Sequence, residues 1–311
     1  MPGFIAHLLF GQQTAAYSFS DHQTAFNLGL QGPDIFFYHI PAYTKYPKNI
    51  GNVMHSVSTG LFFKNLLESR YSFTKVDDLS VCDAYISGFI GHYTLDTWCH
   101  PFIYHFTHHF DNLDTQGKNY DFGVHVSYET DIDHMLIDQF KHCLPSQFDY
   151  AAQVRLSASE ESVVVQLLFS AINLTYPEFG IKNSTIKGAI HSFINLNHAM
   201  HDPSGHKKAL VARLEKLIVG CCFISAMVPS DTIIKNSDPL NLSHSTWHNP
   251  WDESLVSSES FLERFNSASR EYEHRINLYH NYITAYDASI LEDLGNLSYL
   301  SGISVDLTPF D

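Results

Sequence analysis

Charged side chains are scarce in this sequence of 311 residues, because Asp, Glu, Lys and Arg together make up only 16% of it. Apolar residues make up 44%, which excludes a disordered chain and provides for a sizeable core. Lysine and arginine number 18 against 33 acidic residues, which gives a formal net charge of -15. An acidic chain repels nucleic acid phosphates, so we expect no duplex nucleic acid partner unless bound cations supply positive charge.

Cysteine and long apolar runs are scarce as well. The five cysteines are odd in number and lack paired metal-type spacing, so we expect reduced core thiols instead of a disulfide framework. The mostly apolar segment 217–228 is shorter than the roughly 20 residues that span a bilayer. We expect it to form a buried helix and expect no transmembrane segment. The first ten residues show no secretory leader, so we expect a cytoplasmic location.

Apolar residues recur with helical spacing along most of the chain. Helices are expected over residues 4–17, 22–30, 52–69, 79–104, 122–143, 160–174, 186–200, 207–228 and 261–294. Pro101 should disturb or end one helix, residues 111–120 should form a loop, and no segment alternates as a strand. We therefore predict an all-α fold in which residues 1–311 form one domain. Residues 1 to about 145 would carry the functional site, and residues from about 146 to 311 would complete the helical bundle.

Histidine, by contrast, is abundant: its 20 copies outnumber lysine and arginine together. Histidine is the commonest metal ligand in proteins. His92, Asp96 and His100 are spaced four residues apart, so a helix would place them on one face. Burying that polar stripe without partners would be costly. A shared metal ion would satisfy all three side chains.

A second polar stripe repeats this spacing at His125, Glu129 and Asp133. Histidine nitrogens and carboxylate oxygens on rigid helices suit zinc. Three more candidates lie upstream: His7, Asp34 and His55. A single buried histidine is often a hydrogen-bonded core residue, and one pair could be a surface contact. The two stripes together favour a helical metal site, without specifying a reaction.

Taken together, these residues resemble the zinc-dependent phospholipase C family. The matching segments are PGFIAH at 2–7, LQGPD at 30–34, His55, GHYTLD at 91–96, His100, and His125 with Glu129. That family shares its all-helical fold with the S1 and P1 nucleases and is similar to the catalytic part of glycosylphosphatidylinositol-specific phospholipase D. The resemblance implies a phospholipase C and P1 nuclease-like multi-helix bundle around a multinuclear zinc site.

The resemblance also implies a ligand set for two to three zinc ions. One ion would be held by Asp34, His55, His92 and Asp96, and a second by His100, His125 and Glu129. A third would lie between His7, the bridging Asp96 and the first residue of the mature chain, which becomes Pro2 if Met1 is removed. His100 follows Asp96 more closely than the next histidine does in many members, so His105 is a competing ligand. We prefer His100 because it continues the helical stripe.

These implications predict a phospholipase C-like phosphoesterase. A metal-activated water would hydrolyse a phosphodiester of a lipid or small alcohol, with Asp34 and Asp96 as catalytic residues and Asp34 as the candidate base. The local charge of zinc would let an acidic protein accept phosphate. The alternatives are a nuclease or nucleotidase of the S1/P1 kind and a non-catalytic zinc-binding protein. The sequence specifies neither the physiological substrate nor the oligomeric state.

Overall fold

The computed structural model describes residues 3–14, 20–202, 204–222, 224–229, 231 and 238–307. Helices dominate this part of the chain, which confirms the all-α prediction. The α-helices are α1 (Phe4–Gln12), α2 (Gln23–Gly29), α3 (Ile40–Thr44), α4 (Ile50–Ser56), α5 (Thr59–Ser69), α6 (Val76–Phe106), α7 (His109–Thr115), α8 (Lys118–Lys141), α9 (Tyr150–Gln153), α10 (Ala158–Thr175), α11 (Asn183–Met200), α12 (His206–Ile218), α13 (Phe261–Ala285) and α14 (Ser289–Leu294). The 3-10 helices η3 (Gly32–Tyr38) and η7 (Ser225–Met227) and the strands β1 (Trp247–Asn249) and β2 (Asp252–Ser257) also matter below.

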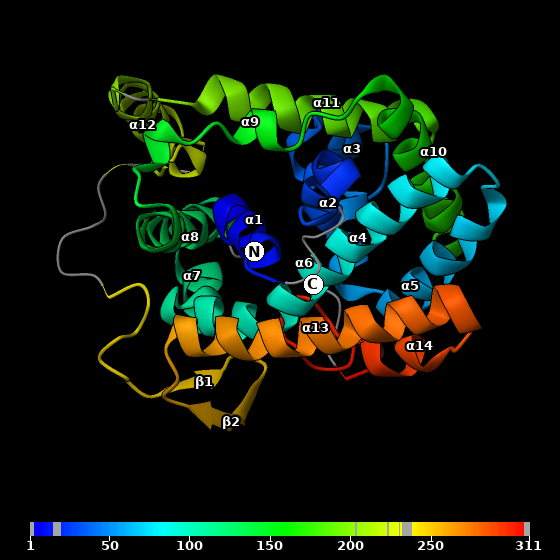
Figure 1. The fold of residues 1–311 in the computed structure, drawn as a ribbon. Coiled ribbons are helices and arrows are strands. Elements are labelled where there is room, and N and C mark those ends of the chain that lie inside the picture. The colour runs from blue at the N-terminus through cyan, green and yellow to red at the C-terminus, as the bar shows by residue number, and fades with distance from the viewer. Residues whose placement is uncertain are drawn as a thin grey trace.

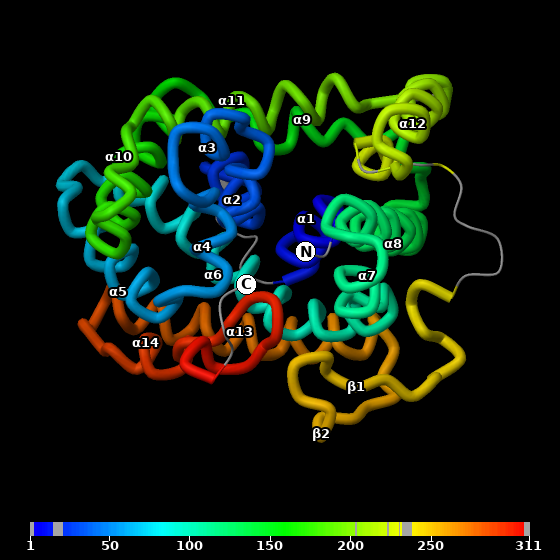
Figure 2. Tube along the Cα trace, turned by 180° about the vertical axis from the view of Figure 1, so that it is seen from behind, coloured from blue at the N-terminus to red at the C-terminus, as the bar shows by residue number. Residues whose placement is uncertain are grey.

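The long helix α6 is the centre of the arrangement. It packs against α1, α2, α8, α10, α13 and β1. In Figures 1 and 2, α13 runs along one side of the molecule and α9 to α11 along the opposite side, with α1 and α6 between them. One hydrophobic cluster contains side chains from Ile5 to Tyr299. This continuous core supports our proposal that both halves of the chain form a single domain.

Helix α6 continues through Pro101 to Phe106, so of the two expected outcomes the proline disturbs the helix and does not end it. Proline has no N–H group, and the carbonyl of Thr97, four residues earlier, therefore loses its helical partner. Gly302 packs directly against that carbonyl, where a Cβ atom would lie only 2.4 Å from the oxygen. Its φ of +65° also favours glycine. The turn that contains Gly302 thus packs against α6 beside Pro101. Because the helix continues, its polar stripe stays on one face.

Several other boundaries differ from the predictions. The helix expected over 52–69 is divided into α4 and α5 at Ser58, whose φ is +51°. The loop expected at 111–120 is mostly α7 and the start of α8. The expectation of no strand was also wrong, because β1 and β2 pair in an antiparallel hairpin with Trp247 opposite Ser257. Strands this short show too few alternations for a periodicity to be visible.

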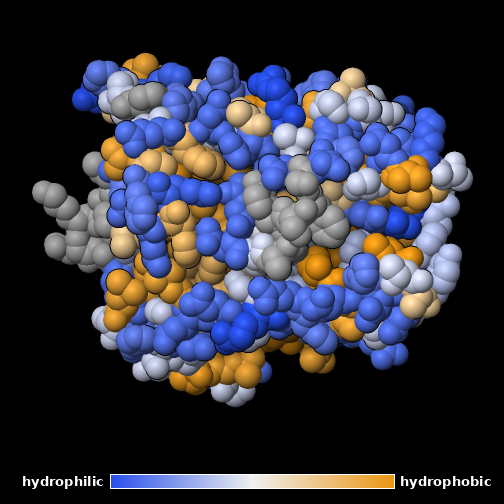
Figure 3. All heavy atoms as spheres, in the orientation of Figure 1, coloured by the Kyte–Doolittle hydropathy of each residue, from blue (hydrophilic) through white to orange (hydrophobic). Residues whose placement is uncertain are grey.

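The largest difference concerns the apolar segment 217–228, which we expected to be a buried helix. Helix α12 ends at Ile218, and the side chains of Leu217 and Ile218 are 83% and 80% exposed. Gly220, with φ of +83°, follows the end of the helix. Figure 3 shows further hydrophobic atoms below α12, in the region between it and α13 that α8 and α1 occupy in Figure 1. Among the described helices, none combines the length and hydrophobicity that crossing a bilayer requires.

Candidate metal centre

Eight side chains singled out in the sequence converge at the centre of the bundle. They come from α1 (His7), η3 (Asp34), α4 (His55), α6 (His92, Asp96, His100) and α8 (His125, Glu129), and all eight are buried. Their ligand atoms form three groups, within each of which the atoms lie no more than 4.8 Å apart: His7, His92 and Asp96; Asp34, His55 and His92; and His100, His125 and Glu129.

The atoms around His92 have the spacing of a tetrahedral zinc site. The Oδ1 atom of Asp34 lies 3.2 Å from Nε2 of His55 and 3.8 Å from Nε2 of His92. The Oδ2 atom of Asp96 lies 3.0 Å from Nε2 of His92 and 3.8 Å from Nε2 of His55. Ligands about 2.0 to 2.2 Å from a tetrahedral zinc are about 3.4 Å from one another. The atoms of Asp34, His55 and His92 lie close enough together to share one ion, and Asp96 lies within 3.8 Å of both histidines.

Asp96 connects this group to a second position. Its other oxygen, Oδ1, lies 3.2 Å from Nε2 of His7, whose ring stacks on His92 with the ring centroids 4.2 Å apart. The two oxygens of one carboxylate thus face different histidines, as a bridging ligand requires. Pro2, the expected backbone ligand at this position, lies outside the described residues.

The remaining group joins α6 to α8. The Oε1 atom of Glu129 lies 2.8 Å from Nε2 of His125 and 3.9 Å from Nε2 of His100. His100 also approaches Asp96, since its Nδ1 lies 3.8 Å from Oδ2 of that carboxylate. His100 of the first polar stripe therefore faces His125 and Glu129 of the second.

Backbone carbonyls orient three of the imidazoles. The Nδ1 atom of His55 donates to the carbonyl of Gly51 at 2.7 Å, and that of His92 donates to the carbonyl of Leu30 at 3.1 Å. His100 donates in the same way to the carbonyl of Tyr299 at 2.7 Å. A carbonyl can only accept, so each ring carries its proton on Nδ1 and directs the lone pair of Nε2 toward the cluster. This is the tautomer that a metal ligand needs.

Tyr299 is a supporting residue that the sequence analysis missed. Besides accepting from His100, it donates its backbone N–H to the carbonyl of His55 at 2.9 Å. Its ring packs against His55 and Tyr93 with centroid distances of 5.0 and 4.8 Å. Both hydrogen bonds use backbone atoms, and nothing in the residue type reveals them. Only its place beside the turn that contains Gly302 brings it to the centre.

Gly32 allows the close approach of η3 to the centre. Its φ is +49°, and a Cβ atom there would lie 2.3 Å from the ring of His92. Glycine is therefore required both by backbone conformation and by space. The LQGPD segment can thus place Asp34 beside His92 on α6.

The buried donor set fits a bound cation. Six of the eight residues have at least one buried side-chain nitrogen or oxygen atom without a hydrogen bond to any described residue: His7, Asp34, His55, His92, Asp96 and His100. Each buried polar atom without a partner costs about 1 to 3 kcal/mol. Zinc takes this mixture of imidazole nitrogen and carboxylate oxygen. A shared ion would therefore satisfy the atoms that the protein alone leaves unpaired.

Burial also tunes the protonation of these groups. It lowers the pKa of both His100 and His125 well below the usual value, which favours neutral rings able to bind a metal. Burial alone would raise the pKa of Asp96, but the neighbouring imidazoles, His92 first, outweigh it and hold that pKa well below its ordinary value. Burial raises the pKa of Glu129 well above its ordinary value. The ionised form of Glu129 thus needs a positive partner.

Removing zinc should therefore destabilise the folded protein. A ligand present at 100 times its Kd stabilises the native state by about 2.7 kcal/mol, so we expect chelation to lower the melting temperature by at least about 5 °C. Calorimetry before and after chelation measures the effect, and adding zinc back should reverse it. An unchanged melting temperature would contradict a zinc site in this core.

Asp133, the last member of the second stripe, has another role. Its carboxylate accepts hydrogen bonds from the backbone N–H groups of Ile5 and Ala6 at 3.1 and 2.8 Å. It therefore caps the first turn of α1, where free N–H groups favour an anion, and it fixes the helix that carries His7. Burial raises the pKa of Asp133 to about 7.

Replacing Asp133 with alanine should leave these N–H groups without their partner. We expect the free energy of unfolding to fall by about 1 to 2 kcal/mol, as for other lost helix caps. Denaturant unfolding of the zinc-loaded protein measures this change. The matched control is Asp138→Ala on the exposed side of α8, which should change stability by less than about 0.5 kcal/mol. Equal effects of the two variants would contradict the capping role.

His105 lies away from the three groups. Its ring centroid is 4.6 Å from that of His248, and its Nδ1 accepts from the backbone N–H of His248 at 3.4 Å. His105 is only partly buried, whereas His100 is buried within a group. The structure thus brings His100, and not His105, to the other candidate ligands.

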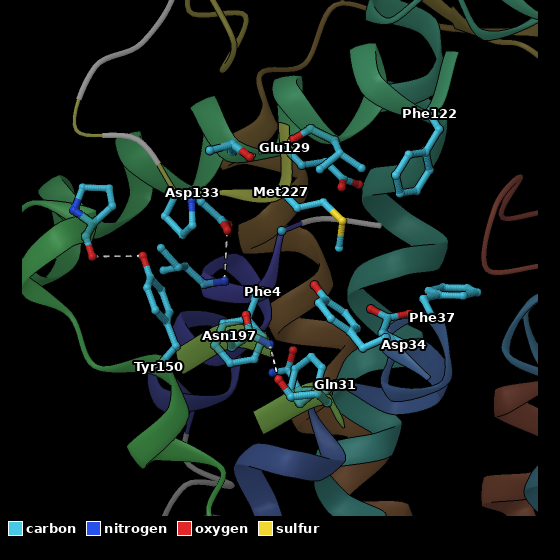
Figure 4. A pocket seen from close by; sticks show the side chains of 18 residues that line it. Phe4, Gln31, Asp34, Phe37, Phe122, Glu129, Asp133, Tyr150, Asn197 and Met227 are labelled. Atoms are coloured by element: carbon cyan, nitrogen blue, oxygen red, sulfur yellow. Dashed lines mark hydrogen bonds between the residues drawn. The ribbon is translucent and has the colours of Figure 1, made fainter. Parts of the chain in front are cut away.

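A pocket opens beside the cluster, and Asp34 and Glu129 form part of its wall. Figure 4 shows Asp34, Glu129 and Met227 facing the same space, with Phe37 and Phe122 beside them. The other described lining residues are Gly3, Phe4, Ile5, Gln31, Tyr38, Val126, Thr130, Asp133, Pro145, Tyr150, Phe193, Asn197 and Pro229. None of the described lining residues is lysine or arginine. The pocket is mainly apolar and reaches two of the candidate ligands.

Comparison with known proteins agrees with this geometry. No curated protein and no solved structure matches the chain. The model of one protein family does match, over residues 3–179, and this family is described as zinc dependent phospholipase C. The matched segment covers more than half of the chain and contains all eight residues of the three groups. The chain therefore belongs to the zinc-dependent phospholipase C family.

Proposed function

We propose that this protein is a phospholipase C-like phosphoesterase that hydrolyses a phosphodiester with the aid of two to three zinc ions. The observation that carries the proposal is the convergence of eight buried imidazole and carboxylate side chains into three groups, two of which share His92. His7, Asp34, His55, His92, Asp96, His100, His125 and Glu129 are the proposed ligands. The family match supports the metal, and the geometry supports these particular residues.

Zinc ions bound there would lower the pKa of a water molecule, neutralise phosphate oxygens and stabilise the leaving alkoxide. Asp34 belongs both to a ligand group and to the pocket wall. We therefore propose that Asp34 is the base that accepts a proton from the attacking water. The water oxygen forms a bond to phosphorus, the ester P–O bond breaks, and a proton returns to the leaving alcohol. Asp96 positions the histidines on its two sides, and its own role is to hold the ions.

The pocket favours a lipid phosphodiester over a nucleic acid strand. Proteins that bind single strands use a positively charged groove together with stacking rings. The described lining has aromatic rings but no basic side chain, and it exposes more apolar than polar atoms. An apolar wall beside the phosphate position suits the acyl or glycerol part of a phospholipid. Access from the pocket to Asp34 and Glu129 also favours catalysis over a closed structural site.

A side-by-side assay tests the proposal. Zinc-loaded protein is incubated with short-chain phosphatidylcholine, a chromogenic phosphodiester, a chromogenic phosphomonoester and single-stranded DNA. We expect hydrolysis of both diesters, with phosphatidylcholine the better substrate, and little cleavage of the monoester or DNA. Faster cleavage of DNA than of phosphatidylcholine would overturn the lipid assignment. No hydrolysis of any substrate by fully zinc-loaded protein would overturn the catalytic proposal.

A further inference from the structure

Helix α12 presents an apolar face to solvent. Leu210, Leu214, Leu217 and Ile218 are 59%, 50%, 83% and 80% exposed. Their spacing of three and four residues places them on one side of the helix. Val219 and Ile224, just beyond the helix, are exposed as well. Four large apolar side chains on one helix face make a contiguous patch of the kind that marks an interaction surface. We call the four residues on this face the α12 patch.

The same helix is basic, although the whole protein is strongly acidic. Lys207, Lys208, Arg213 and Lys216 lie in α12, whose single acid is Glu215. Glu215 is buried and accepts hydrogen bonds from Ser225 through both its backbone N–H and its hydroxyl. Within the described part of the chain, no acidic side chain pairs with Arg213 or Lys216. The exposed side of α12 is therefore both apolar and cationic.

The helix is firmly attached to the wall of the pocket. Glu215 holds Ser225 of η7, and Thr130 of α8 donates to the carbonyl of Ala226 at 3.0 Å. The next residue, Met227, lines the pocket. In Figure 1, α12 lies at the edge of the molecule near α8. Helix α12 is thus attached to the pocket wall through its buried side, while the α12 patch stays exposed.

We propose that α12 is an interfacial helix that docks on the surface of an anionic phospholipid bilayer. Apolar side chains on such helices enter the boundary between head groups and acyl chains, while basic side chains contact anionic head groups. The positive charge decides between occupants, because two copies of this helix in a symmetric dimer would bring like charges together. The link between docking and substrate supply rests on the proposed phosphoesterase function. The docking itself is inferred only from the exposed apolar and basic residues of α12.

Vesicle co-sedimentation tests the docking without any need for activity. Zinc-loaded protein is mixed with vesicles of phosphatidylcholine alone or of phosphatidylcholine and phosphatidylserine, at low and high salt. The test variant replaces Leu214, Leu217 and Ile218 with serine. The matched control replaces three other exposed apolar residues with serine: Leu174, Leu255 and Val256. Circular dichroism and zinc content confirm that both variants are folded.

We expect the wild type and the control to bind the anionic vesicles, and binding to weaken at high salt. The α12 variant should lose about a hundredfold in partitioning. Replacing Arg213 and Lys216 with glutamine should cost about fivefold for each charge removed. Equal vesicle binding by the α12 variant and the control would overturn the proposal, as would a wild type that dimerises through α12 and ignores vesicles.

The same variants separate this inference from the proposed function. Hydrolysis of a monomeric short-chain substrate should be unchanged in the α12 variant, because no candidate ligand is altered. Vesicle binding without hydrolysis would refute the proposed function alone. Hydrolysis of the soluble substrate without vesicle binding would refute the interfacial role alone.

Discussion

Replacing Asp96 with asparagine is expected to abolish hydrolysis and to release zinc from a chain that remains folded. Its two oxygens face His7 on one side and His92 on the other, so the substitution weakens two ion positions at once. Changes to groups that merely orient a ligand already lower metal affinity by about 10- to 100-fold. We therefore expect zinc affinity to fall by more than about a hundredfold when this bridging ligand is replaced. Zinc content by mass spectrometry and phosphodiester hydrolysis measure the two effects.

Asp77→Asn is the matched control for this variant. It makes the same chemical change in the first turn of α6, where the side chain is largely exposed. Zinc content and activity should stay at the wild-type level. A folded Asp96→Asn protein that keeps all of its zinc and its activity would refute the bridging role.

The second large effect is expected to distinguish His100 from His105. Both lie on α6, but only His100 belongs to a ligand group. His100→Gln should remove one ion, since it leaves the Glu129 group with two of its three side-chain ligands, and should lower hydrolysis by at least about a hundredfold. His105→Gln should retain both zinc and activity, because its ring faces His248.

Zinc titration of the two metal-free variants provides the comparison, with melting temperatures to confirm folding. The number of ions bound at saturation is the decisive quantity. Loss of an ion from His105→Gln together with a full complement in His100→Gln would reverse the assignment.

The sequence predicted which candidate ligands lie together better than it predicted the helix boundaries, and α6 shows why. Ligand residues four apart on a helix stay on one face whether the helix begins at residue 76 or 79. The grouping of His92, Asp96 and His100 therefore did not depend on the boundary. The surroundings of Pro101 did depend on tertiary structure. Gly302, which is 201 positions away in the chain, packs against the carbonyl that the proline leaves without a helical partner.

Residues that act through backbone atoms could not be predicted in this way. Tyr299 holds two ligand histidines with its carbonyl and its N–H, and any residue type offers the same two groups. Asp133 continued the stripe of α8 by spacing, yet it binds the first turn of α1. Spacing identifies which side chains share a face, but it does not reveal which neighbour that face will meet.

The segment 217–228 illustrates a third limit. Its hydrophobicity predicted burial, which assumes that apolar residues are covered by the protein's own core. The exposed Leu217 and Ile218 show that hydrophobicity alone does not identify the partner that covers them. The exposed Arg213 and Lys216 provided the missing indication, because lysine and arginine beside an apolar helix face favour a membrane surface.

The most direct test of the central claim is X-ray diffraction at the zinc absorption edge from crystals of protein purified without added metal. We expect anomalous peaks among Asp34, His55, His92 and Asp96 and between His100, His125 and Glu129, with a third beside His7. A folded, catalytically active protein whose anomalous map is empty at these positions would contradict the account.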